Sequence, residues 1–246
     1  MPDLNWNYKT WNDLHRWEKS GDEWSAGWGD ARSQWYGTIL PRVGSFLPAR
    51  RILEIAPGFG RWTQFLLTGC DEYFGVDISE KCVAKCKERF GAHSRVQFMQ
   101  NDGTSLNMIP NEQMDFVFSF DSLVHVDVGV VREYIWQICQ KLTKTGVAFI
   151  HHSNAATDQC DKTQAASVAR SLDVSSAIVK EFVEDCGARV FIQEEVNWAG
   201  TTRIDCLTTF GASDVFPGRQ YTLMQNDHFM LEMELIRKYH LAYNFR

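Results

Sequence analysis

Residues 51–63 read Arg-Ile-Leu-Glu-Ile-Ala-Pro-Gly-Phe-Gly-Arg-Trp-Thr, which is an apolar run, a turn of small residues and the start of a helix. The apolar residues within 52–55 are typical of a buried parallel strand. Gly58 and Gly60 allow the backbone of the turn to approach a ligand closely. A dinucleotide site would need G-x-G-x-x-G, but Thr63 stands at the third glycine position. The stretch therefore predicts a ligand-binding turn that does not hold a pyrophosphate.

Further apolar stretches follow this turn, and they alternate with helical patterns. The predicted strands cover residues 73–77, 96–100, 114–120 and 146–150, and the predicted helices cover 61–68, 79–90 and 130–142. Strands that alternate with helices of about ten residues are typical of a doubly wound parallel sheet. Residues 190–196 and 203–210 flank a short turn and predict an antiparallel hairpin. The expected fold is therefore α/β, with a Rossmann-like, mostly parallel sheet of seven strands.

The length and composition fit one large domain with additions at both ends. The chain has 246 residues, of which 44% are hydrophobic, and no linker or internal repeat divides it. We expect the sheet domain over residues 49–212, with a lid insertion at about 154–174 that is polar and lacks periodicity. Residues 1–48 are predicted to form a helical cap rich in tryptophan, and residues 213–246 a C-terminal extension.

Charge and residue usage exclude several classes of partner. The net charge of −6 argues against nucleic acid, because binding to phosphate backbones depends on basic patches. The sequence has no apolar run long enough for a membrane span, and residues 1–5 lack the features of a signal peptide. Seven cysteines without a C-x-x-C pair suit reduced thiols. These features predict a cytoplasmic protein.

The glycine-containing turn also matches a known motif, because Glu54, Ala56, Gly58 and Gly60 stand in the order E-x-A-x-G-x-G. This is a form of the first motif of class I S-adenosylmethionine-dependent methyltransferases, and the chain resembles that superfamily over roughly residues 50–212. The resemblance implies that the turn wraps the methionine end of S-adenosylmethionine. A C-terminal antiparallel hairpin is also a known feature of that fold.

Acidic residues at two later strand ends extend the resemblance. Asp77 ends the second predicted strand, where the family places an acid on the ribose hydroxyls. Asp102 follows the third strand, where the family places a carboxylate on the adenine amino group. The full set of cofactor contacts that we expect is Trp24, Glu54, Ala56, Gly58, Gly60, Arg61, Asp77, Ile78, Asp102, Gly103 and Phe120.

Titratable residues follow the fourth and fifth strands, and we expect the reaction there. Methyl transfer requires an aligned nucleophile and, for a hydroxyl, a group that removes its proton. The candidates are Asp121, His125, His151 and His152. Asp121 lies where N-methyltransferases of the superfamily often carry Asn-Pro-Pro-Tyr or Asp-Pro-Pro-Tyr, but Ser-Leu replaces the prolines here. The sequence therefore favours a hydroxyl over an amide as the acceptor group.

Two mechanisms remain open for these candidates. In one, His125 or one member of the histidine pair is a general base. In the other, Asp121 and His152, with a further oxygen ligand, hold Mg²⁺ or a similar ion against a sugar diol. Because adjacent residues of a strand point to opposite faces, only one of His151 and His152 is expected to enter the site.

Tryptophans are concentrated near the N-terminus, where six of the nine lie within the first 35 residues. We expect Trp6, Trp11 and Trp17 to attach the segment to the core or to a second subunit, so a homodimer is one alternative. The glycine-containing stretch around Trp24 is expected to be a mobile cover over the cofactor and over the acceptor.

The tryptophan-rich segment, the histidine pair and the Asn197-Trp198 pair resemble bacterial methyltransferases of saccharides and surface polysaccharides. This resemblance implies O-methylation of a sugar or glycan. The alternatives are methylation of a small molecule that is not a carbohydrate, and a cofactor-binding regulatory subunit without catalysis of its own.

Overall fold

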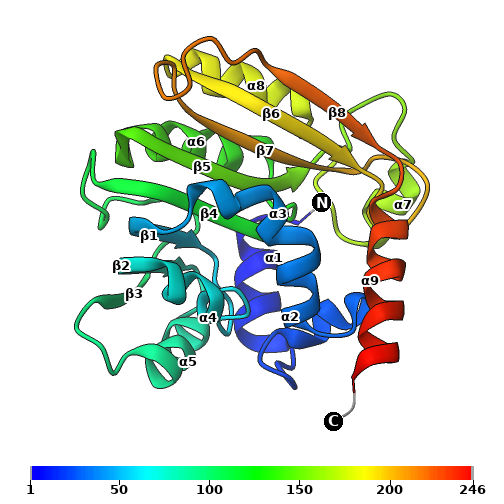
Figure 1. Cartoon of the computed structure of the whole chain (residues 1–246), viewed down its shortest axis with the longest axis horizontal. Coiled ribbons are helices and arrows are strands. Elements are labelled where there is room, and N and C mark those ends of the chain that lie inside the picture. Colours follow the sequence, from blue (N-terminus) through cyan, green and yellow to red (C-terminus); the bar gives the residue numbers. More distant parts are fainter. Residues whose placement is uncertain (1, 245–246) are drawn as a thin grey trace.

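The computed structural model describes residues 2–244, so residues 1 and 245–246 of the predicted cap and extension lie outside the described part. The strands are β1 (Ala49–Ile55), β2 (Cys70–Asp77), β3 (Val96–Gln100), β4 (Met114–Leu123), β5 (Leu142–Ser153), β6 (Ala188–Val196), β7 (Asp205–Ala212) and β8 (Thr222–Asn226). Within residues 2–244 they form one sheet in the order β3-β2-β1-β4-β5-β7-β6-β8 (Figure 1).

The sheet confirms the predicted α/β architecture, but the number of strands differs from the prediction. Strands β1 to β5 pair in parallel, and β7 runs antiparallel to both β5 and β6. The C-terminal hairpin is therefore present as predicted. The prediction of seven strands is wrong, because β8 adds an eighth strand parallel to β6. Its side chains are mostly exposed, so it lacks the apolar run that reveals a buried strand.

Helices of the main domain lie between the strands, short helices form the N-terminal addition, and a 15-residue helix belongs to the C-terminal addition. They are α1 (Leu4–Tyr8), α2 (Ala31–Gln34), α3 (Leu40–Val43), α4 (Thr63–Leu66), α5 (Glu80–Phe90), α6 (Val128–Lys141), α7 (Lys162–Ser167), α8 (Ser176–Asp185) and α9 (Phe229–Tyr243). π-Helical turns cover Lys9–Leu14 and Trp35–Ile39. 3₁₀-Helical turns cover Asp22–Trp28, Gly44–Phe46 and Leu67–Gly69. The predicted lid contains the short helix α7.

Both faces of the sheet are covered, which explains the nearly continuous apolar character of its strands. Leu53 of β1 packs in the core under α6 and α8, whereas its neighbour Ile52 packs in the core under α4, α5 and the N-terminal segment. Side-chain caps begin α5, α6 and α8, because Ser79, Asp127 and Ser175 each accept a hydrogen bond from a main-chain N–H in the first turn.

The N-terminal cap and α9 together form a cover beside the carboxyl ends of the strands (Figure 1). A side chain at Gly27 would collide with Met233, and one at Gly37 would collide with Ile236. These two glycines of the cap therefore allow α9 to pack directly against it. No helix within residues 2–244 is both long and apolar enough to cross a membrane.

The turn after β1 gives a prediction about stability. Gly60 has a φ of +87°, and a Cβ built there would lie 2.4 Å from the Phe90 ring, so Gly60→Ala should overpack the turn as well as strain its backbone. Gly187 is a matched control, since its φ is +73° but a Cβ there would meet nothing within 4 Å. In urea unfolding, Gly60→Ala should cost about 1–3 kcal/mol more than Gly187→Ala. Equal losses would show that the Phe90 contact is easily relieved.

Candidate active site

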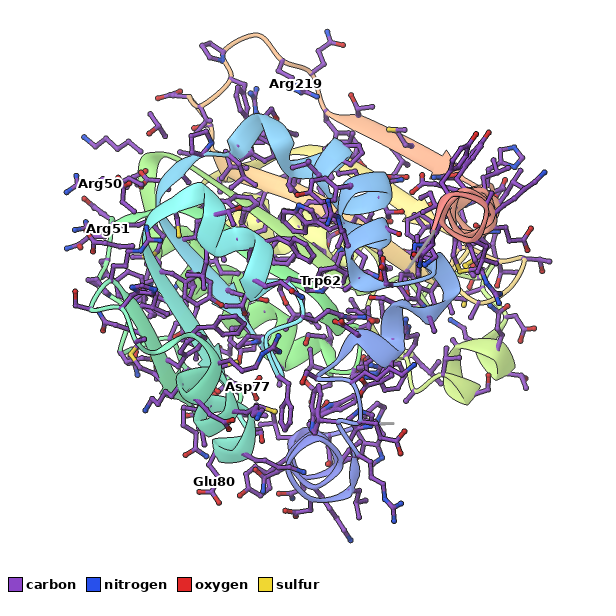
Figure 2. All side chains as sticks on the ribbon, turned by 60° about the horizontal axis from the view of Figure 1, so that its bottom comes forward. Arg50, Arg51, Trp62, Asp77, Glu80 and Arg219 are labelled. Carbon is purple, nitrogen blue, oxygen red and sulfur yellow. The ribbon has the colours of Figure 1, made fainter. Side chains whose placement is uncertain are left out.

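A cavity of about 650 Å³ lies at the carboxyl ends of the parallel strands, where doubly wound sheets bind ligands. This volume is within the range of small-molecule and cofactor sites. Its walls come from the loops after β1, β2 and β4, from the N-terminal cap, from residues 167–170, from Trp198 and from α9. Figure 2 shows Trp62 and Asp77, two residues of the wall, nearer the middle of the molecule, whereas Glu80 and Arg219 lie at its periphery.

One end of the cavity lies over β1 and β2, and Asp77 is its central polar residue. The Asp77 carboxylate accepts hydrogen bonds from the main-chain N–H of Gly58 (3.0 Å) and from that of Ser79 (2.8 Å). Burial raises the pKa of Asp77 to about 6, although these two hydrogen bonds act against the rise. The predicted cofactor residues that the structure places in the cavity wall are Trp24, Ala56, Gly58, Arg61, Asp77, Ile78, Gly103 and Phe120.

Three predicted cofactor residues point elsewhere. The buried Glu54 carboxylate accepts hydrogen bonds from the Thr63 hydroxyl (2.7 Å) and the Tyr73 hydroxyl, and burial raises its pKa to about 7. It therefore holds the start of α4 inside the core. Gly60 packs against the Phe90 ring instead of facing the cavity. The exposed Asp102 carboxylate accepts hydrogen bonds from the main chain of its own turn, so the predicted adenine contact through this side chain is not supported.

Arg61, directly after the glycine-containing turn, has one buried donor without an acceptor. Its Nη2 donates to the Asp121 carboxylate at 2.9 Å, and its guanidinium carbon lies 4.5 Å from the centre of the Trp62 ring. Its Nη1 is buried and makes no hydrogen bond to any residue in the described part of the chain. A buried cationic donor without a partner is unfavourable, so the arrangement suits a ligand that brings an oxygen acceptor.

Asp121 belongs to a buried ionic network. The carboxylate lies between Arg61 and Arg170, the latter at 3.8 Å, and Arg170 also donates to Asp205 at 2.8 Å. Burial acts to raise the pKa of Asp121, but the charges of Arg61 and Arg170 outweigh it and keep this pKa below its usual value. The backbone of Asp121 has a φ of +63°, a conformation that non-glycine residues adopt mostly at tight or functional positions.

His151 orients this network. Its Nδ1 accepts the Asp121 main-chain N–H at 3.1 Å, so the ring proton is assigned to Nε2, which donates to Asp205 at 3.1 Å. With both nitrogens occupied and the side chain fully buried, His151 has no nitrogen left to accept a proton from a substrate. His151 is therefore not placed to act as the general base expected from the sequence, and its hydrogen bonds connect the main chain of Asp121 to Asp205.

His152 lies away from the cavity, as expected for one member of an adjacent pair. Its Nδ1 donates to the Ser153 carbonyl (2.8 Å), and its Nε2 is 2.7 Å from the Thr208 hydroxyl. Burial lowers its pKa to about 4. Because its ring is hydrogen-bonded inside the sheet, His152 is not placed for the catalytic and metal-binding roles expected from the sequence. No group of three or more His, Cys, Asp or Glu within residues 2–244 has the geometry of a metal site.

His125 lines the cavity and has one free ring nitrogen. Its Nδ1 donates to the Ala169 carbonyl at 2.8 Å, which leaves the lone pair on Nε2 without a hydrogen-bond partner among residues 2–244. Asn7 of the cap donates to the His125 carbonyl at 2.8 Å, and the Trp11 ring lies 5.5 Å from the imidazole. Burial, together with the charge of Arg170, lowers the pKa of His125 to about 4, so the ring is neutral at physiological pH.

Tryptophans of the cap form much of the wall. Trp11 lies 6.0–6.3 Å from the rings of Trp6, Trp17 and Trp24, and all four line the cavity. Trp17 also stacks on Phe59 at 4.6 Å, so the cap closes directly over the glycine-containing turn. The expected division between attaching tryptophans and a covering Trp24 is therefore not observed.

Several wall residues were not among the predicted site residues. Arg170 comes from the predicted lid, Trp198 from the turn between β6 and β7, and Met230 and Met233 from α9. Trp198 stands in a turn whose composition could have drawn attention to it. The two methionines belong to α9 and carry no local signal of a site.

Comparisons with known proteins agree with the family resemblance. Residues 52–146 match the family model described as a methyltransferase domain. Over 117 residues the chain is 31% identical to phosphoethanolamine N-methyltransferase 3 of Arabidopsis thaliana, and the match covers 46% of this chain and 24% of that protein. The chain thus spans about a quarter of the length of this relative.

Solved structures of similar fold include two S-adenosylmethionine-dependent methyltransferases. One, from Leishmania major, has a TM-score of 0.64 at 15% identity, with 84% of this chain and 82% of that chain covered. The other, from Mesorhizobium loti, has a TM-score of 0.54 at 16% identity, with 72% of this chain and 97% of that chain covered. At these identities the likeness shows a shared fold.

Proposed function

We propose that this chain, which has the fold of the class I S-adenosylmethionine-dependent methyltransferases, transfers a methyl group to the hydroxyl of a small molecule. The observation that carries the proposal is the composition of a single cavity. It combines Asp77 and the unpaired donor of Arg61 at one end with a neutral histidine, His125, whose Nε2 is free.

The residues at the β1–β2 end fit the cofactor. Asp77 would accept hydrogen bonds from the ribose hydroxyls, and Nη1 of Arg61 would donate to the methionine carboxylate. A Cβ at Gly58 would lie 2.8 Å from the Trp17 ring, so glycine at this position allows Trp17 to pack directly on the turn. Bound S-adenosylmethionine would supply a methyl carbon that is already activated by its positively charged sulfur.

The chain itself supplies alignment and a base. His125 would receive the hydroxyl proton on Nε2, because Nδ1 is committed to the Ala169 carbonyl. Asp121 and His151 would fix the loop that carries His125. We propose a reaction without a metal ion, since the Asp121 carboxylate is already paired with two arginines.

The volume of the cavity, about 650 Å³, favours a small acceptor over a long glycan. Of the acceptors expected from the sequence, a compact sugar and a small molecule that is not a carbohydrate both remain candidates. The Arabidopsis relative is named for an amine substrate, so phosphoethanolamine belongs in any screen of acceptors. The free base nitrogen of His125 favours an enzyme over a regulatory subunit.

Replacing Asp77 tests the cofactor assignment. In isothermal titration, S-adenosylhomocysteine should bind the unmodified protein, and Asp77→Ala should weaken binding by about 1.5–3 kcal/mol through the loss of charged hydrogen bonds. Asp71 is an exposed acid on the same strand, so the control variant Asp71→Ala should leave the affinity for S-adenosylhomocysteine unchanged. Binding of NADH without binding of S-adenosylhomocysteine would overturn the proposal.

The raised pKa of Asp77 predicts a pH dependence of cofactor affinity. The ionised carboxylate accepts both ribose hydrogen bonds, and it becomes protonated as the pH falls through about 6. The Kd of S-adenosylhomocysteine should therefore be constant at higher pH and rise by up to about tenfold per pH unit below this value. Titrations from pH 5 to pH 8 would measure this, and Asp77→Asn should remove the dependence. A pH dependence that persists in Asp77→Asn would assign it to another group.

A further inference from the structure

The second end of the cavity lies beside β4, the turn between β6 and β7, and α9, and rings and thioethers form its wall. The wall residues there are Trp28, Trp62, Phe120, Trp198, Met230 and Met233. Trp198 is at the centre of this group, because its ring lies 5.5 Å from Trp28, 6.1 Å from Phe120 and 5.6 Å from Phe229. A flat apolar ligand would find aromatic faces here together with the polarisable sulfur atoms of α9.

Polar side chains at this end are already paired. The hydroxyls of Ser122 and Ser167 donate to main-chain carbonyls, and Asp121 and Arg170 belong to the ionic network. A polyhydroxylated sugar would therefore bury several hydroxyls without partners, and each would lower affinity by about tenfold or more. Within the described residues, the buried donors of the cavity wall without an acceptor are Nη1 of Arg61 and Nε1 of Trp62, which lies in this part of the wall and suits a ligand with few oxygens.

We propose that the acceptor is a phenol, whose aromatic ring packs on Trp198 beside Met230 and Met233 and whose hydroxyl faces Nε2 of His125. This inference rests on the proposed function and narrows its substrate class. In the reaction the phenol oxygen forms a bond to the methyl carbon as the carbon–sulfur bond breaks. The electron pair of that bond stays on sulfur, and the hydroxyl proton passes to His125.

The chemistry of the base agrees with this choice. The pKa of His125, about 4, makes it a weak base. A phenol, with a pKa of about 10 as in tyrosine, gives up its proton more readily than an aliphatic hydroxyl. A weak base of this kind therefore suits an acceptor whose hydroxyl is comparatively acidic.

Binding of matched ligands in the presence of saturating S-adenosylhomocysteine tests the proposal. We would measure the Kd of 4-methylphenol, 4-methylcyclohexanol and methyl glucoside by isothermal titration, and detect methyl ethers by mass spectrometry with S-adenosylmethionine. 4-Methylphenol should bind at least tenfold more tightly than the other two and be converted to its methyl ether. Equal or tighter binding of the cyclohexanol or the glucoside would overturn the phenol assignment.

Variants locate the binding site. Trp198→Leu and Met230→Gln should each raise the Kd of 4-methylphenol by about tenfold or more, while the Kd of S-adenosylhomocysteine stays unchanged and reports a folded protein. Trp136→Leu is the control, because Trp136 is 54% exposed on α6 and lies outside the cavity wall. Unchanged phenol affinity in both Trp198→Leu and Met230→Gln would overturn the site. Failure of S-adenosylhomocysteine to bind the unmodified chain would instead overturn the proposed function.

Discussion

His125→Ala should lower the turnover number by about 10²–10⁴-fold, the usual contribution of a general base, while the affinity for S-adenosylhomocysteine stays unchanged. The reason is geometric, because His125 alone among the four predicted catalytic groups combines a place in the cavity wall with a free ring nitrogen. Single-turnover kinetics with an identified acceptor would measure the loss. His93 is an exposed histidine, so the control variant His93→Ala should leave the turnover number unchanged.

The pH profile separates this base from an ordinary histidine. The neutral ring is the active form, and the pKa of His125 is lowered to about 4. With a saturating cofactor, the rate should therefore stay constant from pH 8 down to about 5 and fall as the pH approaches 4. A fall centred near pH 6.5, the usual value for histidine, would contradict the buried environment described here.

Asp205→Ala should give the largest loss of stability, about 3–5 kcal/mol in the free energy of unfolding. Asp205 is fully buried and accepts hydrogen bonds from Arg170 and from His151, so its removal leaves the Arg170 guanidinium buried with only the more distant Asp121 as a counter-charge. Urea unfolding would measure the change. Asp214 is an exposed acid, so the control variant Asp214→Ala should change the free energy of unfolding by less than about 0.5 kcal/mol.

The same carboxylate predicts how stability depends on pH. Burial acts to raise the pKa of Asp205, but Arg170 and His151 lower it to about 2, below its value of about 3.9 in an unfolded chain. The stability from this pair is therefore present above pH 4 and is lost as the pH falls from about 4 to about 2. In acid titrations, Asp205→Ala should lack this component. An unchanged acid transition in the variant would show that other carboxylates control it.

Most of the fold follows from local patterns in the sequence. The apolar run before Gly58, and the alternation of strands with capped helices, are consequences of a sheet buried on both faces. β8 could not be predicted in this way. Its side chains face solvent, and it forms because a free edge of β6 accepts it, which is a tertiary effect without a local pattern.

Site residues were predictable where their position near the end of a strand places them at the cavity. Asp77, Asp121 and His125 all follow strands at the edge where ligands bind, and all line the cavity. The direction of a side chain at that edge was not predictable, so Glu54 points into the core instead. Only the packing of distant segments brings the methionines of α9 to this edge.

The ionic network beside the cavity has a consequence for solution conditions. Two arginines and two aspartates balance one another there, and the side chains of Arg61, Asp121, Arg170 and Asp205 are at most 10% exposed. Mobile ions screen exposed charges over about 8 Å at physiological ionic strength, but they reach buried pairs poorly. The ionic network should therefore keep its geometry at salt concentrations that dissociate the surface ion pair of Lys85 and Glu88.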